Sequence, residues 1–169
     1  MVRILVVDDD AAIRGIIETM LRSSAATGNV ELAITTAEDG ESCLAAVAEQ
    51  IPDIVIVDLL MPRLDGVQTC KALRNRAGAR SLELCVISGI YRDAAVVKRV
   101  ESELGARFFG KPEGLPELAV HVGQVAERAA QSTRRDPQRE RVHHQAAARD
   151  RGAPRGSVPR SGRARALCL

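Results

Sequence analysis

Aromatic residues are nearly absent from this sequence, whose 169 residues include no tryptophan, one tyrosine and two phenylalanines. So few rings cannot form the stacking platform on which many proteins bind single-stranded nucleic acid. Long apolar runs are also missing, and no stretch approaches the ~18 residues needed to cross a bilayer. The first residues, MVRILVVDDD, reach three acids before a signal-peptide core could form. We therefore expect no membrane span, no secretory signal and no aromatic nucleic-acid surface.

Cysteine and histidine spacings typical of a metal or disulfide framework are also missing. The four cysteines are spread along the chain as Cys43, Cys70, Cys85 and Cys168. Unpaired thiols are typical of a reducing compartment, so we expect a cytoplasmic protein with neither a zinc site nor disulfides. The histidines have no ligand-type partners in the sequence and are given no role: His121, His143 and His144.

Positive charge is concentrated at the C-terminus. Residues 132–169 hold ten arginines, no lysine and three acids, a net charge of +7, whereas the preceding residues carry −5. This segment has few large aliphatic residues, three prolines and three glycines. It cannot bury enough apolar surface to offset the entropy of ordering. We expect a folded domain over residues 1–131 and a disordered, Arg-rich tail over 132–169, with no specific nucleic-acid partner, because unstructured positive charge binds without specificity.

Short apolar runs alternate with helix-length segments in residues 1–131. The runs are rich in β-branched residues, which is typical of strands buried on both faces of a parallel sheet. Strands are predicted over 4–7, 54–57, 84–87 and 106–109, with a weaker one over 30–35. Helices are predicted over 11–22, 38–50, 65–76, 92–104 and 115–129. Five strand–helix units in this order predict an α/β fold with a doubly wound, five-stranded parallel sheet.

One face of the first predicted helix is apolar. Its members recur at helical spacing: Ile13, Ile16, Ile17, Met20 and Leu21. We expect this face to pack against the sheet.

Polar residues stand where four of the predicted strands end. Asp8 and Asp9 follow the first strand, Asp58 the third, Ser88 the fourth and Lys111 the fifth. The carboxyl ends of parallel strands meet at one edge of the sheet, where ligands bind in such folds. We therefore expect these five side chains to converge.

Three converging carboxylates repel one another, by about 4 kcal/mol per pair at 4 Å and an effective dielectric constant near 20. One lysine cannot neutralise them, whereas a hard divalent cation such as Mg²⁺ or Mn²⁺ can. Such an ion, an ammonium and a hydroxyl are what phosphoryl transfer needs for positioning and charge stabilisation. A carboxylate can itself accept the phosphoryl group. This set indicates phosphoryl transfer to an aspartate.

Four pieces of the sequence together resemble the receiver domain of bacterial two-component response regulators, of the chemotaxis-regulator type. They are VVDDD (6–10), VDLLMPRLDG (57–66), SG (88–89) and KP (111–112). The similarity covers residues 1 to about 128. It implies a flavodoxin-like fold with strand order 2-1-3-4-5, and a signalling switch rather than an enzyme.

The resemblance also implies roles for the site residues. Asp58 would be phosphorylated by a histidine kinase or phosphotransfer protein, with Lys111 and Ser88 contacting the phosphoryl oxygens. The metal would be bound by Asp9, Asp58 and the backbone carbonyl of Leu60, and through water by Asp8.

The switch implied by the resemblance is a repacking of Ser88 and Phe108. It would change the face formed by the fourth helix, fifth strand and fifth helix, which would bind an unknown downstream protein or a second copy of the chain. Leu60 and Ile90 correspond to the positions that flank the path of attacking water. Neither can orient a water, so we expect slow loss of the phosphoryl group.

Two other functions remain open on the sequence alone. A haloacid dehalogenase-like enzyme would use Asp8 as nucleophile and Asp10 as acid or base, although Ala12 stands where that family has threonine. A phosphorylation-independent interaction module could use the same fold.

Asp10 and Asp65 precede predicted helices and are interpreted as helix caps.

Overall fold

The structure, a computed structural model, describes residues 1–26, 30–76, 82–90 and 93–135. The strands are β1 (Val2–Val7), β2 (Leu32–Ala37), β3 (Ile54–Asp58), β4 (Glu83–Ser88) and β5 (Arg107–Gly110). The helices are α1 (Ala11–Ala26), α2 (Gly40–Glu49), α3 (Gly66–Asn75), α4 (Ala94–Leu104) and α5 (Leu115–Arg135). The predicted tail over 132–169 lies outside the described residues from position 136 onward. No helix in the described part is long and apolar enough to cross a membrane.

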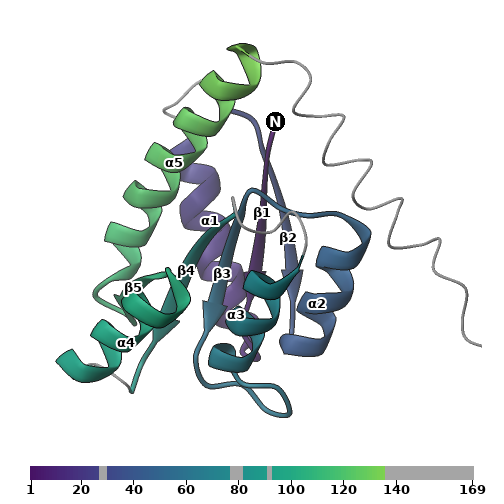
Figure 1. The fold of residues 1–169 in the computed structure, drawn as a ribbon. Coiled ribbons are helices and arrows are strands. Elements are labelled where there is room, and N and C mark those ends of the chain that lie inside the picture. Colours follow the sequence, from purple (N-terminus) through teal and green to yellow (C-terminus); the bar gives the residue numbers. More distant parts are fainter. Residues whose placement is uncertain (27–29, 77–81, 91–92, 136–169) are drawn as a thin grey trace, which may run out of the picture.

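Five parallel strands form one sheet in the order β2-β1-β3-β4-β5 (Figure 1), which confirms the predicted fold class. The second strand begins at Leu32, two residues later than expected. It lies at the edge of the sheet and is only partly buried. The apolar run that indicates a doubly buried strand is therefore weak there, and it does not set the bounds of the strand.

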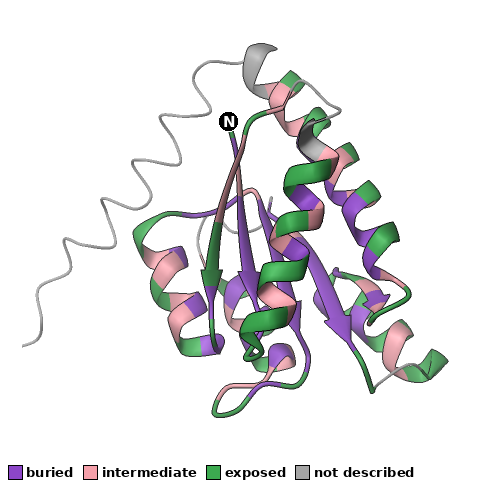
Figure 2. Cartoon of the chain, turned by 180° about the vertical axis from the view of Figure 1, so that it is seen from behind, coloured by how far each residue is buried: buried purple, intermediate pink, exposed green. Residues whose placement is uncertain are grey.

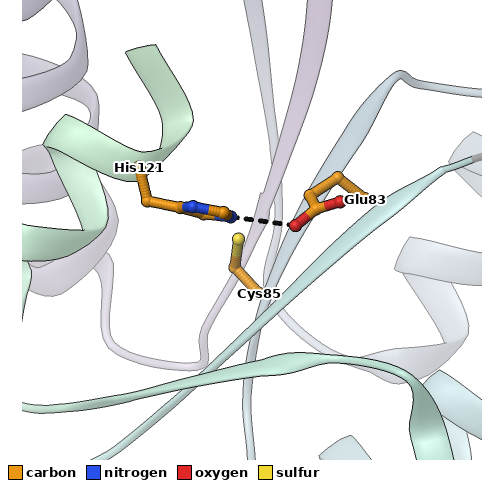
Figure 3. A group of neighbouring side chains, drawn as sticks. All are labelled: Glu83, Cys85 and His121. Atoms are coloured by element: carbon orange, nitrogen blue, oxygen red, sulfur yellow. Dashed lines mark hydrogen bonds and ion pairs between the residues drawn. The ribbon is translucent and has the colours of Figure 1, made fainter. Parts of the chain in front are cut away.

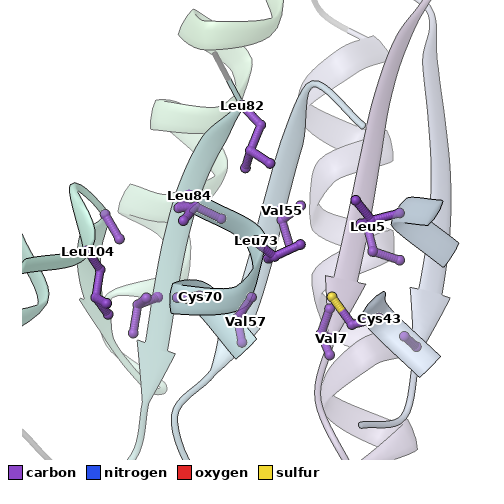
Figure 4. Packing of buried hydrophobic residues seen from close by; sticks show 14 of the residues in the cluster. Leu5, Val7, Cys43, Val55, Val57, Cys70, Leu73, Leu82, Leu84 and Leu104 are labelled. Carbon is purple, nitrogen blue, oxygen red and sulfur yellow. The ribbon is translucent and has the colours of Figure 1, made fainter. Parts of the chain in front are cut away.

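Helices cover both faces of the sheet, and the alternation of strand side chains divides the core in two. Leu5, Val55 and Leu84 point to the face covered by α2, α3 and α4 (Figure 4). Their sequence neighbours point to the other face, which α1 and α5 cover. Apart from Arg3 and Glu83, which are partly buried, the residues of the three central strands are buried, while the outer sides of the helices are exposed (Figure 2). This two-sided burial holds the strand ends rigidly in place.

Aspartates begin several of the helices, as predicted for two of them. The Asp10 carboxylate accepts from the Ala12 amide at 2.8 Å, and the Asp65 carboxylate accepts from the Gln68 amide at 2.8 Å. Both interpretations as caps are confirmed.

The predicted apolar face of α1 packs against the sheet only in part. The prediction is wrong for Ile16, which is 48% exposed although Ile17 is buried. The two side chains are about 100° apart around the helix, so only one can face the sheet.

Gly66 lets α3 begin directly against the end of β3. Its amide donates to the Leu59 carbonyl oxygen at 3.1 Å. A Cβ at this position would overlap the Asp58 carbonyl oxygen and lie 2.7 Å from Leu59 Cα. The missing side chain therefore fixes how closely α3 approaches the backbone of Asp58.

Two glycine-to-alanine substitutions should change stability in opposite directions. Gly66→Ala should lower the free energy of unfolding by about 1–3 kcal/mol, because the new methyl group overlaps backbone atoms. Gly15→Ala, in the exposed interior of α1 with no atom within 4 Å of the new Cβ, should raise it by about 0.5–1 kcal/mol. Urea unfolding of both variants measures the two effects. A Gly66→Ala protein as stable as wild type would contradict the close approach.

Candidate functional site

The acidic side chains come from neighbouring strands at one edge of the sheet. Val7 pairs with Val57, so that the next residues, Asp8 and Asp58, leave β1 and β3 side by side. On the other side of β3, Asp58 pairs with Ile87, the residue before Ser88. The register of parallel strands thus brings together residues about fifty positions apart in the sequence.

Lys111 follows β5 and bridges two of the acids. Its Nζ lies 2.9 Å from Asp8 Oδ2 and 3.3 Å from Asp58 Oδ1. Its backbone amide donates to the Ser88 carbonyl oxygen at 2.8 Å, which fixes the end of β5 to the end of β4. Asp8 Oδ1 accepts from the Asp10 amide at 2.9 Å, so both oxygens of the Asp8 carboxylate have partners.

The carboxylate oxygens of Asp58 have fewer hydrogen-bond partners than those of Asp8. Its Oδ1 is buried and accepts no hydrogen bond of good geometry, although the Lys111 ammonium lies nearby. Burial raises the pKa of the Asp58 carboxyl above its ordinary value, and the charge of Asp8 adds to the rise. The Lys111 charge and the Leu60 amide act in the opposite direction but do not cancel it. The fold therefore holds the ionised Asp58 carboxylate at a cost.

Burial by itself lowers the pKa of the Lys111 ammonium, but the hydrogen bond to Asp8 and the charge of Asp58 outweigh it. The pKa of Lys111 is therefore raised, and the side chain stays charged. One positive charge faces three carboxylates, because Asp9 completes the cluster at its exposed side.

The acidic cluster of Asp8, Asp9 and Asp58 has the donor set of a magnesium site. One oxygen from each carboxylate lies within 4.8 Å of the others. Carboxylate oxygens are the ligands that hard divalent cations prefer. The buried Oδ1 of Asp58 without a hydrogen bond fits such a cation, since a bound ion would give that oxygen a partner.

The remaining predicted residues lie around this cluster. The Ser88 hydroxyl oxygen accepts from the Ile90 amide at 3.3 Å. Leu60 is 39% exposed and Ile90 is 74% exposed, so both apolar side chains face solvent. Phe108 lies on β5 and packs, partly buried, against the core on the α4 side. The structure thus brings the predicted set to one sheet edge, with Phe108 on the adjacent strand.

Sequence reasoning missed two arginines that hold this edge. Arg14 Nη1 donates to the Asp8 carbonyl oxygen at 2.6 Å, from the first turns of α1. Its position four residues after the Asp10 cap was the available signal. Arg63 has a positive φ of 67° and forms an ion pair with Asp39, the cap of α2. No local sequence pattern indicates that contact.

His121 has side-chain partners that the sequence did not indicate. Its Nε2 lies 2.8 Å from Glu83 Oε1, and Cys85 is close to both. This second group lies at the start of β4, whereas Ser88 lies at its end.

Comparisons with known proteins agree with this geometry. Protein PilG of Pseudomonas aeruginosa is 35% identical over 124 residues, covering 71% of this chain and 87% of PilG. Response regulator MprA of Mycolicibacterium vanbaalenii is 37% identical over 129 residues, covering 75% of this chain but only 51% of MprA. The chain therefore spans about half the length of MprA. The structure of the chemotaxis protein CheY4 of Vibrio cholerae is similar, with a TM-score of 0.62 and 25% identity over 74% of this chain and 98% of CheY4.

A family model, described as the response regulator receiver domain, matches residues 4–122. That match covers all of the sheet except the first two residues of β1, and it includes the acidic cluster, Ser88 and Lys111. The chain therefore belongs to the response regulator receiver domain family, whose members act in phosphorylation-dependent two-component signalling rather than as classical enzymes.

Proposed function

We propose that Asp58 accepts a phosphoryl group from a histidine kinase or phosphotransfer protein, and that this modification switches the protein between two states. The observation that carries the proposal is the buried Asp58 carboxylate, with one oxygen lacking a hydrogen bond, beside two further acids and a charged lysine. A bound cation would give that oxygen a partner, and a carboxylate oxygen can itself bond to the phosphorus of an incoming phosphoryl group.

The surrounding residues have distinct roles in this proposal. Asp9, Asp58 and the Leu60 carbonyl would hold Mg²⁺ or Mn²⁺, with Asp8 acting through water. When bound, the ion supplies positive charge that offsets the carboxylates and the phosphoryl oxygens. Lys111 already lies between Asp8 and Asp58, and its ammonium would pair with a phosphoryl oxygen.

The contacts of Asp8 and Asp10 argue against a haloacid dehalogenase-like enzyme. Both oxygens of the Asp8 carboxylate accept hydrogen bonds, which lowers its availability as a nucleophile. Asp10 caps α1 and so cannot act at the same time as acid or base on a substrate. A phosphorylation-independent module would not need the acidic cluster, which the chain retains.

The readout in this proposal is a repacking between Ser88 and Phe108. Phosphorylation adds about −1.5 to −2 charges, and the Ser88 hydroxyl would move to donate to the new oxygens. Phe108, partly buried on the strand next to Ser88, would fill the space that is left. Both residues adjoin the face of α4, β5 and α5, where we place the contact with a downstream protein or a second copy.

The buried free thiols of Cys43, Cys70 and Cys85 support a cytoplasmic location.

Phosphorylation should occur on Asp58 alone and should require a divalent ion. Incubation with acetyl phosphate and Mg²⁺ should add one phosphoryl group by intact mass, and Asp58→Asn or excess EDTA should abolish the adduct. Asp10→Asn is the matched control, because asparagine caps a helix as well as aspartate does and the cluster is left complete. An adduct that survives Asp58→Asn, or forms fully in EDTA, would refute the proposal.

The raised pKa of Asp58 gives a pH-dependent stability. Folding disfavours the ionised form, so the wild type loses stability as pH rises through the folded-state pKa of Asp58. Asp58→Asn should therefore be more stable than wild type at pH 7 without divalent ions, and the difference should vanish below the ordinary carboxyl pKa of 3.8.

In denaturant unfolding at pH 7, Mg²⁺ should make the wild type more stable than Asp58→Asn. At about 100 times its dissociation constant, the ion should stabilise the wild type by about 2.7 kcal/mol and the Asn variant by much less. Equal stabilisation of both proteins would show that Asp58 is not a ligand.

The phosphorylated state should be long-lived because Leu60 and Ile90 cannot position a water. General-base assistance is worth about 10²–10⁴-fold in rate, and Leu60→Asn/Ile90→Glu should recover part of it. Loss of the phosphoryl group, followed by intact mass, should be faster in this double variant. Ile16→Glu/Val120→Asn introduces the same two polar residues in place of exposed apolar residues of α1 and α5 and should leave the rate unchanged. Equal rates in all three proteins would mean that these side chains do not control water attack.

A further inference from the structure

Three side chains with different ligand atoms meet between β4 and α5. Glu83 and Cys85 are two residues apart on β4 and point to the same face of the sheet, and His121 of α5 lies over them (Figure 3). A carboxylate oxygen, a thiol sulfur and an imidazole nitrogen lie within 4.8 Å of one another. His121 Nε2 and Glu83 Oε1 are 2.8 Å apart.

The three side chains lie partly in the rigid core and partly within reach of solvent. Cys85 is fully buried in the core, the His121 side chain is 11% exposed and that of Glu83 is 38% exposed. β5 pairs with β4 from Cys85 onward, so Glu83 precedes the paired stretch. An ion could therefore reach the buried donors along Glu83. The group lies at the opposite end of β4 from Ser88 and shares no residue with the acidic cluster.

We propose that Cys85 Sγ, His121 Nε2 and a Glu83 carboxylate oxygen bind one Zn²⁺ ion, with water as the fourth ligand. Thiolate, imidazole and carboxylate are the ligands that Zn²⁺ takes in tetrahedral sites. The sulfur disfavours Mg²⁺, which selects oxygen ligands. One thiolate and one carboxylate together neutralise the charge of the ion, so the complex can be buried without an excess charge.

The proton balance of binding follows from the present hydrogen bonds. Arg107 can only donate, so its 3.4 Å contact with His121 Nδ1 is a hydrogen bond in the neutral tautomer that carries the proton on Nε2, facing Glu83. Binding moves that proton to Nδ1, and Arg107 must then turn away from the ring. The Arg107 side chain is half exposed and also pairs with Glu117, so it can remain with Glu117 when it leaves His121.

The Cys85 thiol supplies the one proton that is released. Burial raises the pKa of this thiol, so it is protonated at neutral pH. Formation of the Zn–S bond therefore releases one proton to solvent. The affinity for zinc should therefore rise with pH, because a thiol must lose its proton to become a metal ligand.

The test uses the full chain, reduced and freed of metal, with excess Mg²⁺ present to occupy the acidic cluster. Cys168→Ser, His143→Ala and His144→Ala form the background, because the tail carries these other donors. Titration with Co²⁺ should give one equivalent with a thiolate-to-cobalt charge-transfer band, and Zn²⁺ should displace it. The displacement curve gives the Zn²⁺ affinity.

Single variants then separate this site from adventitious binding. Cys85→Ser should abolish the band. Glu83→Gln and His121→Gln should weaken binding by more than the 10–100-fold typical of outer-shell partners. Glu103→Gln, an exposed carboxylate paired with Arg99 on α4, should leave the affinity unchanged. Arg107→Ala should strengthen binding severalfold, because it removes a positive charge beside the ion.

Three results would overturn the proposal: no charge-transfer band, a band that persists in Cys85→Ser, or equal affinities in Glu83→Gln and Glu103→Gln. If Cys85→Ser does not fold, the partly exposed Glu83 decides the question, since its substitution leaves the core intact. The outcome is independent of Asp58, so phosphorylation can be measured on the same variants to keep the two functions apart.

Discussion

Every strand of the described sheet runs in the same direction, and the site depends on this constraint. A parallel sheet must bring all its carboxyl ends, with the charges that follow them, to one edge. Asp8 and Lys111 are 103 residues apart in the sequence, yet their side chains lie 2.9 Å apart. Three carboxylates collected in this way face a single ammonium. A divalent cation can relieve this excess of negative charge, and only then can the site take the further negative charge of a phosphoryl group.

The core makes that imbalance tolerable. Asp58 ends a strand buried on both faces, and Gly66 brings the start of α3 against its backbone. At the far end of α3, the Arg74 guanidinium donates to the carbonyl oxygens of Leu82, Leu104 and Gly105, which ties α3 to β4 and to the end of α4. In a less rigid structure the carboxylate would move toward solvent. Here the packing keeps it buried, and this burial raises its pKa.

One strand joins the two proposed sites of this protein. The proposed phosphorylation site uses Ser88 at the end of β4, and the proposed zinc site uses Glu83 and Cys85 at its beginning. α5 supplies His121 to the second site and also forms part of the face on which we place the readout. An ion that links β4 to α5 would therefore hold one element of that face against the sheet, away from the chemistry at Asp58.

Patterns that are local in the sequence predicted most of the fold and the acidic edge. Doubly buried strands have continuous apolar runs, and the residues after parallel strands must share one edge of the sheet. The sequence therefore places Asp8, Asp58, Ser88 and Lys111 together. Asp10 and Asp65 were recognised as caps because capping depends on residues two or three positions away. The bounds of β2 and the exposure of Ile16 were wrong because an edge strand and the border of a helix face leave only weak apolar patterns.

The sequence by itself determined which residues end the strands, and with them the acidic cluster and its lysine, because strand direction and side-chain periodicity follow from short-range chemistry. Tertiary structure alone decided that His121 lies over Glu83 and Cys85, and that Arg63 pairs with Asp39. These contacts depend on how α5 crosses the sheet and on how the loop after β3 turns. Both are set by packing between elements that are distant in the chain, and no local pattern of residues encodes that packing.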